Sequence, residues 1–176
     1  PVACPSHLKD RPDLAMVLRR AQLPVIDSTP QRARCPGAPV ASSNRLLTVA
    51  NRLPVRRTEA GEWKTSPGGL VAAIAPFLRD REGVWVGWTG EADDAIDSFH
   101  HDGINNRVVS LTHSEIDAFY RGFSNGTLWP LYHDCVRPPE YHRRWWWPYV
   151  DVNRRFAEQA VDEITERELV WIHDYQ

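Results

Sequence analysis

The stretch from Tyr120 to His133 combines four aromatic side chains with a Ser-Asn-Gly sequence and a Trp-Pro pair. Sugar pockets use this mixture, because flat aromatic faces pack on the C–H face of a sugar ring while polar groups meet its hydroxyls. A helix–turn–helix that fills a core would explain the stretch equally well, although buried Tyr and Trp side chains then need hydrogen-bond partners. The stretch alone is compatible with both interpretations, and residues elsewhere must decide between them.

Arg52 comes just after the apolar run Leu46–Ala50, which has the length of a strand buried on both faces. A guanidinium group at a strand end can bind a phosphate through two parallel hydrogen bonds. A surface salt bridge is the alternative, because Arg45, Arg56 and Arg57 show that arginine is common in this stretch. Arg45 precedes the strand and belongs to the opposite edge of the sheet, so we predict that Arg52 is the phosphate ligand.

Gly68 and Gly69 stand at the predicted start of a helix, where Ser66 is placed as the N-cap and Pro67 at the first helical position. The first N–H groups of a helix and the positive end of its dipole favour an anion or a ligand oxygen. Glycine leaves these groups unshielded. A tight turn that needs a positive φ at glycine is the alternative explanation.

His173 and Asp174 follow the last predicted strand. A carboxylate at this place could accept hydrogen bonds from two sugar hydroxyls at once. The alternative is an Asp that caps the next helix.

The sequence shows no pattern typical of a metal centre or of a nucleophilic catalyst. His100 and His101, His133 and His142 lack a supporting carboxylate pattern. A Gly-x-Ser-x-Gly nucleophile elbow is also absent from the sequence. We therefore expect neither a metal ion nor another cofactor.

Apolar patterns predict the elements that must position these residues. Thr112 and Glu115 form a capping-box pair at the start of one helix. A polar loop is predicted from Asn51 to Thr65. Strands are predicted at 46–50, 83–88, 107–111 and 169–172, and helices at 66–78, 112–120 and 149–167.

Strands that alternate with helices predict an α/β fold, with a Rossmann-like parallel sheet and helices on its faces. Ligands of such sheets bind at the carboxyl ends of the strands. This edge should carry Asn51-Arg52, Gly87-Trp88 and His173-Asp174. Three consecutive tryptophans, Trp145 to Trp147, cannot share one helix face, so we expect at least one to pack in the core and another to lie on the surface or at a partner contact.

Composition is that of an ordinary globular chain, with 21 basic and 23 acidic residues and a net charge of −2. This balance argues against a nucleic-acid-binding surface. No apolar run approaches the roughly 20 residues of a membrane span. Three scattered cysteines suit reduced thiols and a cytoplasmic location.

Residues 1–43 hold seven of the fourteen prolines and are predicted to form a poorly ordered leader, in which only Asp13–Gln22 could be a short helix. The chain starts at Pro1 without an initiator Met, which indicates a processed or partial chain.

Taken together, residues 46–176 resemble the N-terminal portion of the trehalose-6-phosphate synthase family, whereas residues 1–43 match nothing in its pattern. The resemblance is carried by six stretches in the family's order: Val49-Ala50-Asn51-Arg52-Leu53-Pro54, Ser66-Pro67-Gly68-Gly69-Leu70, Trp85-Val86-Gly87-Trp88, Tyr120 to Leu131, Val152-Asn153-Arg154-Arg155-Phe156-Ala157, and Val170-Trp171-Ile172-His173-Asp174-Tyr175-Gln176.

The resemblance implies a retaining glucosyltransferase of the two-domain GT-B architecture. Such an enzyme transfers glucose from a nucleotide sugar, typically UDP-glucose, to glucose 6-phosphate and gives trehalose 6-phosphate. It uses neither a protein nucleophile nor a metal ion. Residues 44–176 would then be an incomplete N-terminal, acceptor-binding domain that lacks the C-terminal nucleotide-binding domain.

The resemblance also implies roles for single residues. Arg52 and Tyr120 would bind the acceptor phosphate, and Asp174 would be the catalytic carboxylate on the glucose hydroxyls. The other substrate-binding residues would be Gly68 and Gly69 on the nucleotide sugar, Trp129 at the anomeric end of the pocket, and Trp88 as a pocket wall.

The family's second domain supplies the Arg and Lys that neutralise the departing diphosphate, so we expect this chain to be inactive as a transferase by itself. The full-length enzyme is expected to be a homo-oligomer. Two alternatives stay open: a relative that uses another phosphorylated acceptor, and a non-catalytic homologue that senses sugar phosphates.

Overall fold

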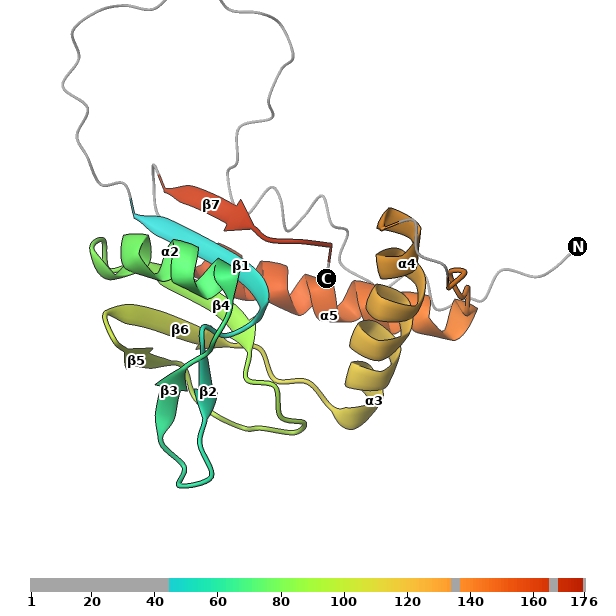
Figure 1. Cartoon of the computed structure of the whole chain (residues 1–176), viewed down its shortest axis with the longest axis horizontal. Helices are drawn as coiled ribbons and strands as arrows, with labels where there is room; N and C mark the ends of the chain where they lie inside the picture. The colour runs from blue at the N-terminus through green and yellow to red at the C-terminus, as the bar shows by residue number, and fades with distance from the viewer. Residues whose placement is uncertain (1–44, 134–136, 165–167, 176) are drawn as a thin grey trace, which may run out of the picture. The chain divides into compact units, whose positions relative to one another are not determined.

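A mostly parallel five-stranded sheet forms the centre of the computed structural model, which describes residues 45–133, 137–164 and 168–175. The strand order is β5-β6-β4-β1-β7, and all neighbours are parallel except β5 and β6 (Figure 1). The strands are β1 (Leu46–Arg52), β4 (Val84–Trp88), β5 (Phe99–His101), β6 (Ile104–Val108) and β7 (Leu169–Ile172). The predicted leader, the helix predicted within it and the three cysteines lie outside the described residues.

Helices cover both faces of this sheet. On one face α2 (Gly69–Arg79) buries Ile74 and Leu78 against Trp85 and Ile104. On the other face, a helical segment and the long helix α5 pack over the remaining strand residues. The segment consists of α3 (His113–Glu115), η2 (Ile116–Leu128) and α4 (Trp129–Tyr132), and α5 spans Arg143–Glu163. The prediction of a Rossmann-like α/β sheet is confirmed.

The alternation of side chains in β4 explains how one strand serves two cores. Val84 and Val86 belong to the cluster under η2 and α5, whereas Trp85 belongs to the cluster under α2. All five residues of β4 are buried, as expected for a central parallel strand.

Three boundaries differ from the predictions. The loop predicted from Asn51 to Thr65 contains an antiparallel hairpin, β2 (Val55–Arg57) and β3 (Trp63–Thr65). Ser66 does not cap α2: its N–H donates to the Pro54 carbonyl, and Gly68 stands at the N-cap position without a side-chain hydrogen bond. The third strand spans Ile104–Val108 rather than 107–111, because its polar residues from Asn105 onward already pair with β4.

Two helices also differ from the predictions. No turn interrupts the helix at Ser124-Asn125-Gly126, since η2 runs through these residues and continues into α4. The long helix begins at Arg143 rather than at Tyr149 and ends at Glu163. The capping box of Thr112 and Glu115 is confirmed.

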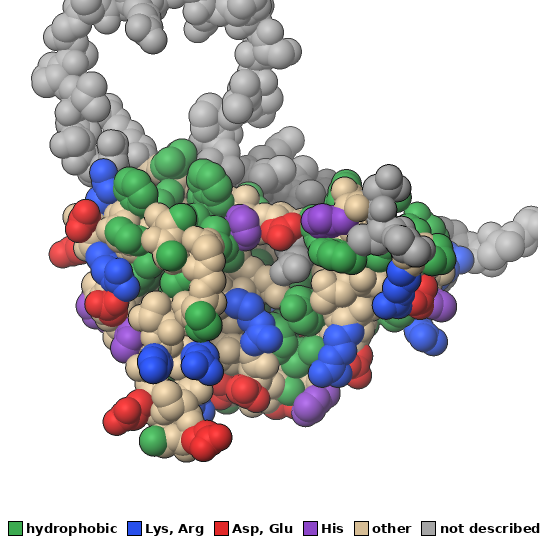
Figure 2. Space-filling model, in the orientation of Figure 1, with side chains coloured by type: hydrophobic (Ala, Val, Ile, Leu, Met, Phe, Trp, Pro, Cys, Tyr) green, Lys and Arg blue, Asp and Glu red, His purple; other side chains and the backbone are tan. Residues whose placement is uncertain are grey.

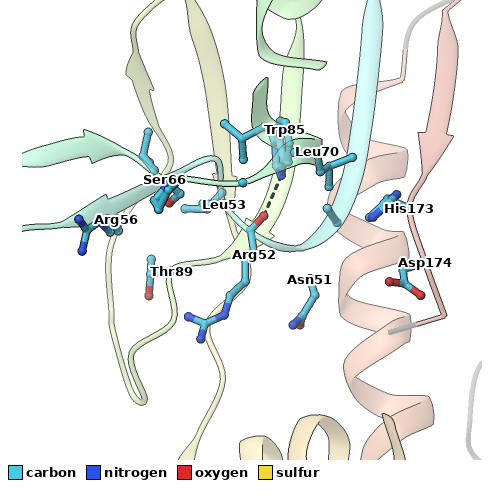
Figure 3. A pocket seen from close by; sticks show the side chains of 16 residues that line it. Asn51, Arg52, Leu53, Arg56, Ser66, Leu70, Trp85, Thr89, His173 and Asp174 are labelled. Carbon is cyan, nitrogen blue, oxygen red and sulfur yellow. Dashed lines mark hydrogen bonds between the residues drawn. The ribbon is translucent and has the colours of Figure 1, made fainter. Parts of the chain in front are cut away.

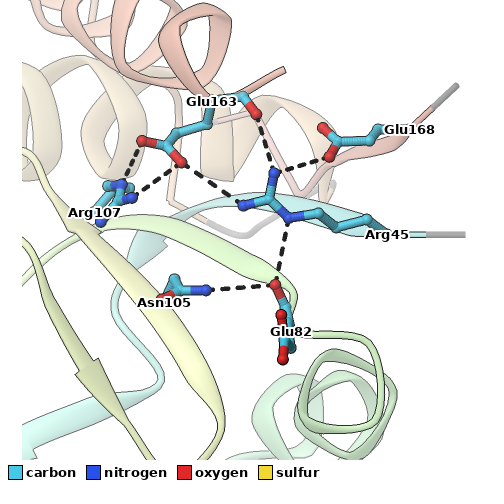
Figure 4. A network of polar contacts seen from close by, with 6 residues as sticks. All are labelled: Arg45, Glu82, Asn105, Arg107, Glu163 and Glu168. Atoms are coloured by element: carbon cyan, nitrogen blue, oxygen red, sulfur yellow. Dashed lines mark hydrogen bonds and ion pairs between the residues drawn. The ribbon is translucent and has the colours of Figure 1, made fainter. Parts of the chain in front are cut away.

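Ion pairs join four segments at the amino-terminal edge of the sheet (Figure 4). Arg45 contacts Glu168 at 2.9 Å and Glu163 at 3.8 Å, and Arg107 donates to Glu163 at 3.1 Å. We refer to these four residues as the ion-pair network. It satisfies Arg45 within the fold, so the arginine before β1 serves the sheet and not a ligand site.

Strand β7 lies at the edge of the sheet and carries exposed apolar side chains. Leu169 is 64% exposed and Ile172 75% exposed. Figure 2 shows hydrophobic side chains gathered over β7 and α2. None of the helices in the described ranges is long and apolar enough to cross a membrane.

Candidate functional site

A cleft of about 500 Å³ opens at the carboxyl-terminal edge of the sheet (Figure 3). Four of the predicted site residues line it, namely Arg52, Gly68, Gly69 and Asp174. They come from the end of β1, the start of α2 and the segment after β7. The other lining residues are Ala50, Asn51, Leu53, Val55, Arg56, Ser66, Pro67, Leu70, Val71, Trp85, Thr89 and His173.

Arg52 lies over an aromatic floor at this cleft. Its Cζ is 4.2 Å from the ring centroid of the buried Trp88 and 5.9 Å from that of Tyr120. The two rings meet edge to face at 5.9 Å. Within the described ranges Arg52 has no ion-pair partner. The site therefore holds a positive charge that the fold leaves available for an anion.

Irregular pairing at the end of β1 sets the backbone of Arg52. The register between β1 and β4 shifts between Val49 and Arg52. Leu53 N–H then donates to the Trp88 carbonyl at 2.9 Å, and the Trp85 indole donates to the Arg52 carbonyl at 2.9 Å. A Cβ at Gly87 would lie 2.7 Å from the Leu53 nitrogen, so this close approach of the two strands requires glycine.

Gly90 leaves the space that the Arg52 side chain occupies. Its φ is +105°, and a Cβ there would lie 1.7 Å from Nη1 of Arg52. Sequence reasoning assigned no role to Gly90, although a glycine two residues after a buried strand is a signal for a special backbone conformation.

The start of α2 forms a second wall of the cleft. Gly68 has φ 155° and ψ 150°, a region that essentially only glycine adopts. This geometry supports the alternative that Gly68 is needed for the turn. Gly69 is different: it begins the helix with ordinary φ, and nothing lies within 4 Å of a Cβ built on it. The fold itself thus does not require the missing side chain of Gly69, and no side-chain hydrogen bond caps the start of α2 where it lines the cleft.

Asp174 approaches the cleft from the end of β7. Its backbone is left-handed, with φ +67°, and its Oδ1 accepts a hydrogen bond from Tyr175 N–H at 2.9 Å. The preceding His173 N–H donates to the Val49 carbonyl at 2.8 Å, which fixes this segment to β1. Non-glycine residues in this conformation are uncommon and gather at functional sites.

A half-buried phenol holds the chain just beyond Asp174. The Tyr149 hydroxyl donates to the Tyr175 carbonyl at 2.6 Å. Burial, together with the neighbouring Tyr132, raises the pKa of Tyr149. Tyr149 therefore stays protonated and keeps donating at neutral pH.

Asn51 is a cleft residue for which the sequence analysis predicts no role of its own. The residue is 8% exposed, and its Oδ1 has no hydrogen-bond partner within the described part of the chain. Leaving such a group unsatisfied costs about 1–3 kcal/mol. Buried polar groups without partners are rare, and this one adjoins the cleft, so Asn51 is a further candidate for ligand binding.

The predicted aromatic residues, Trp88, Tyr120 and Trp129, do not line the cleft. Trp88 and Tyr120 contact the Arg52 side chain, which does line it. Trp129 is 44% exposed and stacks on His133 at 4.9 Å. The His133 ring lies 6.4 Å from that of Tyr175, so Trp129 stands on the side of Asp174 rather than beside Arg52. The described residues contain no group of three side chains suited to hold a metal ion.

Comparisons with known proteins agree with this architecture. Residues 40–176 match the model of glycosyltransferase family 20. The trehalose-6-phosphate synthase of Mycolicibacterium smegmatis is 49% identical over 141 residues, which cover 78% of this chain and 28% of that protein. The corresponding protein of Mycolicibacterium gilvum is 46% identical over 149 residues, which cover 79% of this chain and 30% of that protein.

Two solved structures are similar in fold. The UDP-forming α,α-trehalose-phosphate synthase of Burkholderia vietnamiensis has 32% identity and a TM-score of 0.62, over 75% of this chain and 28% of that one. The enzyme of Burkholderia xenovorans in complex with glucose 6-phosphate has 29% identity and a TM-score of 0.60, over 74% and 28%.

The chain spans less than a third of the length of these relatives. This agrees with the prediction of a Rossmann-like sheet that forms part of a GT-B glycosyltransferase. With the family model covering most of the chain and the sheet matching the solved enzymes, the chain belongs to glycosyltransferase family 20, the family of the trehalose-6-phosphate synthases.

Proposed function

We propose that this chain is the acceptor side of a transferase that moves glucose from UDP-glucose to glucose 6-phosphate, with retention of configuration, and forms trehalose 6-phosphate. The observation that carries the proposal is Arg52, a cation at the cleft over the Trp88 ring without an ion-pair partner in the described part of the chain. The planar guanidinium group of an arginine can donate two parallel hydrogen bonds, which suits a dianionic phosphate group best.

The remaining walls of the cleft suit the rest of the two substrates. Tyr120, beside Arg52, can donate its hydroxyl to the same phosphate. Asp174 can accept hydrogen bonds from sugar hydroxyls, and Trp129 would close the sugar pocket on that side. The open helix start at Gly68 and Gly69 can receive the oxygens of the nucleotide sugar.

Catalysis in this arrangement would rest on position and charge. Holding two sugars in one orientation would supply much of the rate acceleration, because binding has already offset the loss of translational and rotational entropy. The residues proposed here need no metal ion or other cofactor for that role. The reaction is proposed to take place in the cytoplasm.

Titration calorimetry with the chain tests acceptor binding. Glucose 6-phosphate should bind more tightly than glucose, and Arg52→Ala should weaken glucose 6-phosphate by about 10- to 150-fold, the equivalent of one charged hydrogen-bonding group. Arg121→Ala is the matched control, because the Arg121 side chain is 71% exposed and its ion pair is with Asp117 on the same helix. Equal affinities for glucose and its phosphate would refute the proposed role of Arg52.

Turnover is tested on the natural full-length protein. Release of UDP from UDP-glucose should depend on glucose 6-phosphate, and NMR of the product should show an α,α linkage. Tight binding of glucose 6-phosphate without any acceptor-dependent release would instead favour a protein that senses sugar phosphates.

A further inference from the structure

The helix that carries Tyr120 is wound more widely than an α-helix. Thirteen residues, Ile116–Leu128, form η2, a π-helix with hydrogen bonds between residues five apart. The N–H of Trp129 closes this winding on the Ser124 carbonyl. Such helices usually appear as single turns, often at functional sites, so a run of this length calls for a cause.

The wide winding decides which residues share a side of the helix. Tyr120 and Trp129 are nine residues apart. Hydrogen bonds between residues five apart give a π-helix more residues per turn than an α-helix, so nine residues make about two full turns and return to the same side. An α-helix with 3.6 residues per turn would make about two and a half turns and place the two side chains on opposite sides.

The observed contacts agree with a shared side. Tyr120 meets the Trp88 ring and the Arg52 guanidinium at the end of β1 and β4. Trp129 reaches the segment after β7 through His133. Both residues therefore face the carboxyl-terminal edge of the sheet, where the cleft lies.

Trp145 of α5 packs directly on the glycines of this helix. A Cβ at Gly122 would lie 2.7 Å from the Trp145 ring, and one at Gly126 would lie 3.2 Å from it. Both glycines are buried. Neighbouring Trp146 and Trp147 are 45% and 44% exposed, which confirms the predicted surface position. Trp145 is half-buried and packs on the glycines, but it belongs to neither core cluster.

Hydrogen bonds fasten the same part of η2 to the segment before α5. Glu140 N–H donates to the Gly126 carbonyl at 2.9 Å. The buried Thr127 hydroxyl donates to the Glu140 carbonyl. The end of η2 is thus fixed by hydrogen bonds with Glu140 and by the Trp145 ring on its glycines. Both residues lie close together in the chain, just before and at the start of α5.

We propose that Trp145 is a positioning residue: seated on Gly122 and Gly126, it keeps η2 in its wide winding and thereby turns Tyr120 and Trp129 toward one cleft. The winding itself does not depend on the proposed function, whereas its effect on acceptor affinity rests on glucose 6-phosphate being the ligand. Without the ring, the helix is expected to relax to the common four-residue hydrogen bonding.

Hydrogen-bond couplings in NMR of the isotope-labelled chain test the winding without any ligand. In the unchanged chain, the Trp129 nitrogen should couple to the Ser124 carbonyl carbon. In Trp145→Ala this coupling should move to the Asn125 carbonyl carbon, and in Trp145→Phe it should stay. Trp147→Ala is the control and should also leave it unchanged. A coupling that stays on Ser124 in Trp145→Ala overturns the proposal.

A second variant reaches the same contact from the other side. Gly122→Ala places a methyl group against the Trp145 ring and should move the coupling in the same way, which covers the case that Trp145→Ala does not fold. An unmoved coupling in a folded Gly122→Ala chain would equally overturn the proposal.

Affinity then separates positioning from general stability. Each variant that moves the coupling should weaken glucose 6-phosphate by about tenfold at a temperature where it is fully folded, and Trp145→Phe should restore the affinity. A moved coupling with unchanged affinity would refute the positioning role. If the unchanged chain binds no glucose 6-phosphate while the coupling moves as described, the proposed function fails and the assignment of the winding to Trp145 stands.

Discussion

Replacing Gly90 by alanine should weaken acceptor binding through Arg52 without touching a ligand itself. The new Cβ would lie 1.7 Å from Nη1 and 3.0 Å from Cζ of Arg52. Since nonbonded carbon and nitrogen atoms stay about 3.5 Å apart, the guanidinium must move by about 2 Å, off its place 4.2 Å from the Trp88 centroid.

The size of the effect has two bounds. Loss of the cation–π contact alone is about 0.5–1 kcal/mol, or about two- to fivefold in the Kd of glucose 6-phosphate. Complete loss of the phosphate contact would equal the effect of Arg52→Ala, about 10- to 150-fold. The arginine side chain is flexible at its end and can partly follow the ligand, so Gly90→Ala should fall between these bounds.

Stability should change for a separate reason. Alanine at φ +105° is strained, which should lower the free energy of unfolding by about 1–3 kcal/mol. This loss belongs to the backbone of residue 90 and should be the same whether Arg52 is present or not.

A double-mutant cycle distinguishes the two effects. Calorimetry should show that Gly90→Ala weakens glucose 6-phosphate in the unchanged chain but has no further effect in the Arg52→Ala chain, because no guanidinium is left to displace. Urea unfolding should show the backbone loss of about 1–3 kcal/mol in both chains, and a further loss of about 0.5–1 kcal/mol only where Arg52 is present, because its guanidinium leaves the Trp88 ring. The reasoning is refuted if Gly90→Ala weakens binding equally in both chains, since the loop would then act on the ligand without Arg52.

Two further predictions concern the scaffold. Glu163→Gln should lower the free energy of unfolding, measured by urea denaturation, by about 1–3 kcal/mol, because it removes the charge at the centre of the ion-pair network. Glu158 is exposed, so Glu158→Gln is the control and should leave the free energy of unfolding unchanged; equal losses would contradict the network's role. Burial opposes ionisation of Glu115, but hydrogen bonds from Thr112 and the charge of Arg155 outweigh it and lower its pKa below 4.5. The ionised Glu115 carboxylate therefore stabilises the fold above its pKa in the unfolded chain, and this stabilisation is lost as the pH falls through its pKa in the folded chain. The difference in unfolding free energy between the unchanged chain and Glu115→Gln should shrink as the pH falls from about 6 to about 3; a constant difference would contradict this.

Strands were the most predictable part of this fold. The apolar runs Leu46–Ala50 and Leu169–Ile172 were recognised because strands of a parallel sheet are apolar on both faces. The strand Ile104–Val108 was shifted in the prediction because its centre is polar. Asn106 is fully buried there and bonds the Ile104 carbonyl, an arrangement that no apolar pattern reveals.

The candidate site was predictable where a strand or helix end marks it. Arg52, Gly69 and Asp174 follow this rule, and all three line the cleft. Asn51 was placed at this edge without a role of its own, because only the fold shows that burial leaves its oxygen unpaired. Gly90 was missed because its importance lies in a neighbour, the arginine that fills the space beside it.

The wide helix was not predictable from local sequence. Ser124 to Gly126 has the composition of a turn, and helix propensities do not distinguish four-residue from five-residue hydrogen bonding. The contact that overrides the turn comes from Trp145, some twenty residues further along the chain. Only the packing of two helices brings that ring onto the glycines.

The pairing of β1 with β7 has a consequence for the order of folding. These neighbours are parallel, with Leu46 beside Leu169, yet more than a hundred residues separate them in the chain. Contacts between distant residues form late, because closing a long loop costs entropy before any contact repays it. β4, which is much nearer to β1 in the chain, can seat Arg52 on Trp88 early, whereas Asp174 arrives only when the final strand joins the sheet. During refolding, the contact of Arg52 with Trp88 should therefore form before Asp174 reaches the cleft.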